Sequence, residues 1–114
     1  MSLSKECQQR IWILATNVFN SGNDFETYTS KSYLLFKVFE QQSTISNLNE
    51  NENKTLLNVK KILEEVKKER MHQVIRHQDN INNFKIKCDD LISEIITLID
   101  PEIMIDIPIQ EMNF

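Results

Sequence analysis

The sequence is poor in glycine, with one glycine and two prolines in 114 residues. Glycine-rich loops are needed wherever a backbone approaches a phosphate closely, so a P-loop or a dinucleotide-binding fingerprint is excluded. Repeated tight hairpin turns also favour glycine, which argues against a small all-β barrel or sandwich. These absences favour an all-α fold.

The sequence also lacks long apolar runs, and it contains few cysteines. No stretch approaches the ~18 apolar residues of a membrane span, and the run at 11–15 is short for the core of a signal peptide. The two cysteines, Cys7 and Cys88, are too few for a disulfide framework and fit a reducing compartment. We therefore expect an intracellular protein, cytoplasmic or nuclear, without a membrane span.

Charge is distributed unevenly along a chain whose net charge is −4. Residues 54–78 carry seven Lys or Arg and three Asp or Glu, whereas residues 79–114 carry two and eight. The middle segment predicts a basic patch made of Lys60, Lys61, Lys67, Lys68, Arg70 and Arg76. Nucleic-acid-binding domains are usually clearly basic, and this chain has a pI near 5.2. A helical nucleic-acid-binding module is therefore an alternative, and charge that selects a protein partner is the main expectation.

Apolar residues recur at helical spacing from residue 4 to residue 20, and the only glycine follows directly. Gly22 stands where a residue with left-handed backbone closes a helix. A serine at position 2 or 4 is expected to cap the start of this helix.

A second helix is predicted over 24–47, begun by a pair that resembles a capping box, Asn23 and Glu26. The link between the first two helices is short. Short links join antiparallel neighbours, so the N-terminal half is predicted to be a helical hairpin. The polar stretch 47–53 is predicted to be a connector.

A long third helix with coiled-coil character is predicted over 55–99, where apolar residues follow three–four spacing. At 1.5 Å per residue it would be about 68 Å long. Residues 79–83 have poor helix propensity, so a kink or break is expected there. The apolar seam of this helix is predicted to bind a partner through Met71, Val74, Ile81, Phe84, Cys88, Ile92, Ile95 and Ile99.

Residues 1–100 are thus predicted to form one helical domain, and residues 101–114 an extended C-terminal tail. Pro101 ends the third helix because proline disfavours helical geometry in the residue before it. Isoleucines alternate with other residues along the tail at Ile103, Ile105, Ile107 and Ile109. Alternation of this kind is strand-like, so the tail either packs along the helices or pairs with a strand of another protein.

No pattern points to catalysis, a metal or a cofactor. His72 and His77 are five residues apart, about 140° around a helix, and do not converge on one ion. Adjacent carboxylates such as Glu64 and Glu65 point about 100° apart, as on a solvated helix face. We expect no catalytic, cofactor-binding or metal-binding residue, no small-molecule substrate and no enzymatic activity.

The functional expectation is a non-enzymatic subunit or adaptor of a protein complex. The first two helices, about 26 and 36 Å long, would cover only part of a rod about 68 Å long. The uncovered seam would then bind helices of a partner. A self-contained or homodimeric bundle is the alternative if the third helix breaks. The general pattern resembles small helical subunits of eukaryotic multiprotein assemblies, without matching one family.

Overall fold

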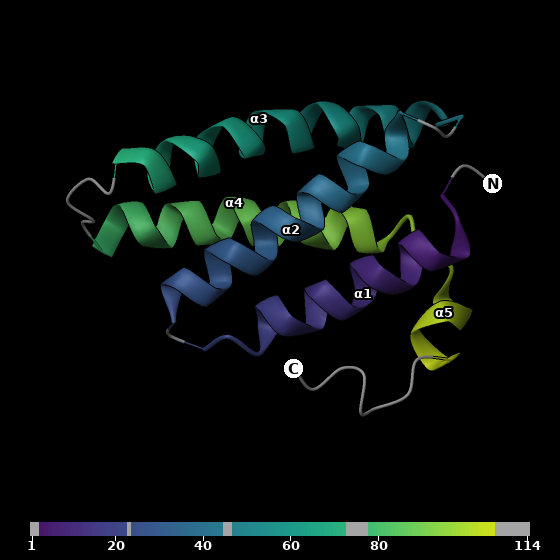
Figure 1. Ribbon diagram of the computed structural model, residues 1–114, viewed down its shortest axis with the longest axis horizontal. Coiled ribbons are helices and arrows are strands. Elements are labelled where there is room, and N and C mark those ends of the chain that lie inside the picture. The colour runs from purple at the N-terminus through teal and green to yellow at the C-terminus, as the bar shows by residue number, and fades with distance from the viewer. Residues whose placement is uncertain (1–2, 23, 45–46, 73–77, 107–114) are drawn as a thin grey trace.

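The structure is a computed structural model that describes residues 3–22, 24–44, 47–72 and 78–106. These residues form five α-helices and no strand (Figure 1). The helices are α1 (Lys5–Phe19), α2 (Phe25–Ser43), α3 (Glu50–His72), α4 (Gln78–Ile96) and α5 (Pro101–Asp106). The all-α class predicted from the sequence is confirmed.

Helix α1 begins and ends as its sequence predicts. The Ser4 side chain accepts a hydrogen bond of 3.1 Å from the backbone N–H of Cys7, which caps the first turn. The helix closes at its C-cap, Asn20, and Gly22 follows with a φ of 63°. A Cβ at Gly22 would meet no atom within 4 Å. A larger side chain would therefore fit in the available space. The turn needs glycine because its backbone is left-handed at this position.

Helix α2 starts at Phe25, one residue later than the predicted start at residue 24. Its N-cap is Asp24, which accepts hydrogen bonds from the backbone N–H and the hydroxyl of Thr27 at 3.1 and 2.6 Å. These bonds lower the pKa of the Asp24 carboxyl. Asn23, the residue that the sequence predicted as the cap, lies outside the described residues. The helix ends at Ser43, so the predicted end at residue 47 was too late.

Helix α3 begins at Glu50, within the stretch that the sequence predicted as a connector. A capping box explains the difference. The Asn49 N–H donates to Glu52 Oε1 at 2.9 Å, and the Glu52 N–H donates to Asn49 Oδ1 at 2.8 Å. The pair satisfies two backbone donors reciprocally and outweighs the polar composition of the segment.

The predicted single helix over 55–99 is wrong, because α3 and α4 lie side by side. The Thr55 hydroxyl donates to Glu94 Oε1 at 2.8 Å, although 39 residues separate them. The longest extent of the molecule is 42 Å, well short of a rod of about 68 Å. The chain reverses between His72 and Gln78, so the predicted break at 79–83 falls inside α4.

The predicted extended tail is also wrong for residues 101–106, which form α5. Pro101 occupies the first position of α5, where the backbone N–H that proline lacks would have no partner within the helix. The Asp100 side chain accepts from the Glu102 N–H at 3.0 Å. Ile103 is buried, and α5 packs on α1. The side chain of Ile105 and all of Ile107 and Ile109 lie outside the described part of the chain.

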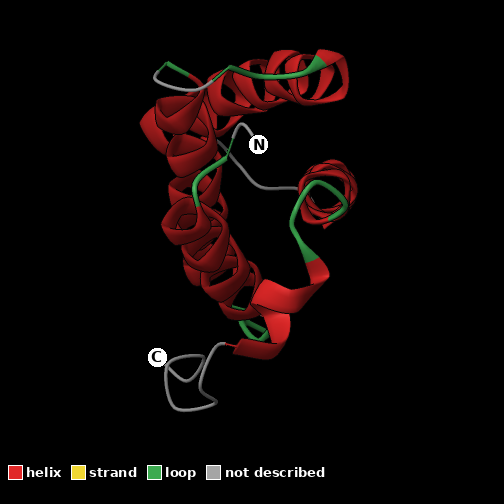
Figure 2. Ribbon diagram, turned by 90° about the vertical axis from the view of Figure 1, so that its right-hand side faces the viewer, coloured by secondary structure: helices red, strands yellow, loops and turns green. Residues whose placement is uncertain are grey.

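Helix α4 packs one side against the rest of the fold and leaves its other side exposed. Figure 2 shows it end-on, with α1 and α2 on one side, α3 above and α5 below. Its buried residues join those of α1, α2 and α3 in one hydrophobic core. The largest fully buried apolar side chains are Phe36, Phe39, Ile11, Leu35, Ile92 and Ile95.

Candidate functional site

The predicted partner seam of α4 lies inside the chain's own core. Cys88, Ile92 and Ile95 are 0% exposed, and Ile99 is 4% exposed. Since these four residues belong to the chain's own hydrophobic core, whose other members include residues of α1, α2 and α3, they form no partner-facing surface in this structure, which corrects the prediction for them.

The other members of the predicted seam divide into two groups. Phe84 is half-buried, and its ring meets the ring of Phe25 edge-on, with centroids 6.1 Å apart. It therefore links α4 to the start of α2. The side chains of Met71 and Ile81, and Val74 as a whole, lie outside the described residues.

The predicted basic patch lies on α3, where Lys60, Lys61 and Lys67 are exposed. The side chains of Lys68 and Arg70, and Arg76 as a whole, fall outside the described part. Glu64 and Glu65 are exposed between the lysines. The described surface therefore alternates in charge.

Two buried polar ties that the sequence did not reveal hold the helices in register. The first is Gln8, which is fully buried. Its amide nitrogen donates to the carbonyl of Leu3, and its amide oxygen accepts from the Asp100 N–H, both at 2.9 Å. A glutamine on the apolar face of α1 is the only sequence signal for this link between the N-terminus and the α4–α5 turn.

The second tie joins α2 to α4 through Tyr28. Its hydroxyl donates to Asp89 Oδ1 at 2.6 Å and lies 2.9 Å from the carbonyl oxygen of Lys85. The Lys85 ammonium sits 5.0 Å from the centre of the same ring. Burial, reinforced by the bond to Asp89, raises the pKa of Tyr28 well above its ordinary value. The phenol stays protonated and acts as a hydrogen-bond donor.

The two thiols are protonated for the same reason. Burial raises the pKa of Cys7 to about 11 and that of Cys88 to about 12. The thiolate is the nucleophilic and metal-binding form of cysteine. Neither residue is therefore poised for nucleophilic or redox chemistry at neutral pH.

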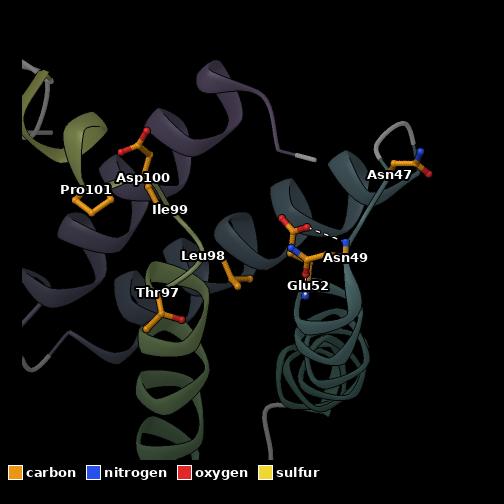
Figure 3. A pocket seen from close by; sticks show the side chains of 8 residues that line it. All are labelled: Asn47, Asn49, Glu52, Thr97, Leu98, Ile99, Asp100 and Pro101. Carbon is orange, nitrogen blue, oxygen red and sulfur yellow. Dashed lines mark hydrogen bonds between the residues drawn. The ribbon is translucent and has the colours of Figure 1, made fainter. Parts of the chain in front are cut away.

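A hollow of about 540 Å³ lies where α3 begins and α4 leads into α5 (Figure 3). Asn49 and Glu52 on its wall are the capping pair. The side chain of each residue therefore accepts a hydrogen bond from the backbone N–H of the other, at the start of α3. The residues that line this hollow are Asn47, Asn49, Glu52, Thr97, Leu98, Ile99, Asp100 and Pro101.

A second hollow, of about 320 Å³, runs between α3 and α4. Its apolar floor is formed by Ile62 and Leu91, and charged or polar side chains form both banks. Lys87 forms an ion pair of 3.7 Å with Glu65 across it. The complete lining consists of Asn58, Lys61, Ile62, Glu65, Lys87, Asp90, Leu91 and Glu94.

Two large apolar side chains lie exposed beside this second hollow. Leu57 is 61% exposed and Ile86 is 57% exposed. Each precedes a lining residue by one helical turn, Leu57 before Lys61 and Ile86 before Asp90, so each lies next to a bank of the hollow. We name the surface made of the second hollow, Leu57 and Ile86 the α3–α4 outer face.

The described part of the chain contains no group of three or more His, Cys, Asp or Glu placed to hold a metal ion. None of its helices combines the length and apolar character needed to span a membrane.

Comparison of the chain with protein-family models, curated proteins and solved structures gives no significant match.

Proposed function

We propose that this protein is a non-enzymatic helical adaptor or subunit that binds a protein partner through the α3–α4 outer face. One observation carries the proposal. This face combines an apolar floor, two exposed apolar side chains and charged banks on two antiparallel helices that lie side by side. Apolar centres with polar rims are typical of protein interfaces.

In this proposal the two halves of the chain have different tasks. Helices α1 and α2 act as a supporting hairpin, and α3 and α4 pair in coiled-coil manner to present the face. The buried residues of α4 hold the bundle together, so binding does not require the bundle to open. The buried, protonated thiols of Cys7 and Cys88 fit a protein of a reducing compartment, cytoplasmic or nuclear.

The proposal is tested with Leu57→Asp combined with Ile86→Asp in the full chain. Both residues are exposed, so the variant should keep the circular dichroism spectrum and melting temperature of the wild type. We expect affinity purification from native cells to lose the partners that the wild type retains. Phe19→Asp is the matched control, because Phe19 is 50% exposed on α1, away from this face. Partners retained by the Leu57/Ile86 variant, or lost equally with Phe19→Asp, would contradict the proposal.

A further inference from the structure

Among the residues that the structure describes, some charges on the α3–α4 outer face have no ion-pair partner. Glu65 pairs with Lys87, and Glu94 accepts from Thr55 at 2.8 Å and from Asn58 at 3.5 Å. Lys61 on the α3 bank and Asp90 on the α4 bank both line the hollow. Neither forms an ion pair with any residue in the described part of the chain. Among the described residues, the face thus presents one lysine, Lys61, and two carboxylates, Asp90 and Glu94, without an ion-pair partner, and Glu94 is hydrogen-bonded within its own chain.

Lys61 and Asp90 stand at the same level of the bundle. The cross-helix contacts Asn58–Glu94 and Glu65–Lys87 bracket them on both sides. Lys61 lies three residues after Asn58, and Asp90 lies four residues before Glu94. Because α3 and α4 run in opposite directions, these offsets bring Lys61 and Asp90 to opposite banks of the same stretch of the hollow.

A surface of this kind is complementary to itself. A two-fold axis that lies over the hollow, parallel to the helices, sets α3 of one molecule over α4 of another. That arrangement brings Lys61 of each molecule over Asp90 of the other, giving two identical pairs. It also removes Leu57 and Ile86 of both molecules from water. A polyanion would meet the carboxylates of Glu65, Asp90 and Glu94 on the same face, so the charge pattern disfavours nucleic acid.

We propose that the partner of the α3–α4 outer face is a second copy of this chain, bound across a two-fold axis along the hollow, with Lys61 of each copy paired to Asp90 of the other. This inference rests on the proposed function and names its partner. Because Lys61 and Asp90 lie at the same level along the hollow, the two-fold axis places each of them opposite its counterpart in the second copy. An unrelated partner would need its own pair of opposite charges at matching positions.

The test is sedimentation equilibrium of the full chain across a concentration series. The wild type should associate reversibly to twice the mass of 13.5 kDa. Lys61→Asp and Asp90→Lys, each alone, should weaken the dimer on the order of tenfold, because each replaces two attractions with two repulsions. An equimolar mixture of the two variants should dimerise like the wild type, since each mutant charge then faces its opposite. Lys60→Asp is the control, because exposed Lys60 makes the same charge change without lining the hollow.

The mixture separates the proposed pairing from pairing within one chain. If Lys61 and Asp90 served only their own fold, the single variants would melt earlier and mixing them would restore nothing. A wild type that stays monomeric at all concentrations, or a mixture that fails to regain association, would overturn the second-copy inference. If partners that depend on Leu57 and Ile86 are still captured in that case, the proposed function stands while this inference falls.

Discussion

Two buried polar side chains tie together parts of this bundle that are distant in sequence. Gln8 and Tyr28 each join helices that are distant in sequence, and each has its polar atoms bonded. Ser32 differs, because its fully buried hydroxyl has no hydrogen-bond partner among the described residues. The buried indole nitrogen of Trp12 also lacks a partner among these residues. An unsatisfied buried donor costs free energy, so both groups lower the stability of the fold.

Ser32→Ala should therefore stabilise the protein, by roughly 1 kcal/mol in the free energy of unfolding. The matched change is Thr55→Val, which also removes one buried hydroxyl. That hydroxyl donates to Glu94, so its loss should destabilise by about 1 kcal/mol. Urea unfolding followed by circular dichroism measures both. A lower stability for Ser32→Ala would show that its hydroxyl has a partner in solution.

The buried thiols predict a loss of stability at alkaline pH. Their pKa values in the folded protein, about 11 for Cys7 and about 12 for Cys88, lie above the ordinary value of about 8.5 for an unfolded thiol. The unfolded chain therefore releases these protons first. Their contribution is fully present below pH 8 and declines as the pH rises through 9 and beyond.

The corresponding measurement is the urea midpoint at pH 8 and at pH 10.5. The wild type should lose more stability over this interval than a variant with Cys7→Ala and Cys88→Ala, which lacks the two titrating groups. Equal losses in both proteins would mean that the thiols ionise normally in the fold.

At the scale of helices, the sequence predicted which segments are helical better than it predicted where each helix begins and ends. Ser4 and Gly22 mark the limits of α1 because capping and left-handed geometry are local properties. The start of α3 was missed because polar residues 47–53 are typical of a connector, while the Asn49–Glu52 capping box depends on bonds between neighbours. The reversal between α3 and α4 was misplaced because it depends on burying Ile92 and Ile95, which is a tertiary effect.

The capping box makes a prediction of its own for α3. Asn49→Ala should lower the free energy of unfolding by about 1 kcal/mol, since the Glu52 N–H loses its acceptor. Asn47→Ala is the matched control, because Asn47 lines the same hollow but caps nothing. Thermal unfolding monitored by circular dichroism compares the two. Equal effects would show that the box does not set the start of this helix.

At the scale of the whole molecule, the α4 seam that suggested a partner instead completes the core. The apolar pattern was correctly identified as a surface that must be covered, but the sequence could not show that the cover comes from the same chain. The site proposed here was not visible in the pattern for the same reason. Leu57 and Ile86 become significant only once α3 and α4 lie side by side.

Truncation of two isoleucines of α4 should therefore change stability by very different amounts. Ile92→Ala removes a side chain that is 0% exposed and should cost about 2–5 kcal/mol of stability. Ile86→Ala changes an exposed residue on the same helix and should alter stability by less than about 0.5 kcal/mol. Chemical denaturation at low protein concentration measures both without interference from association. Comparable losses would mean that α4 does not bury Ile92.

The central claim, that α4 folds back along α3 and is covered by its own chain, is tested most directly by one distance. Spin labels at exposed Lys54 and Thr97, in a chain diluted with unlabelled protein, report the separation of the two helices by double electron–electron resonance. Packed neighbouring helices have axes 8–10 Å apart, so with the label arms we expect a distribution below about 30 Å. A continuous helix would separate these positions by about 65 Å, and a distribution centred there would contradict the account.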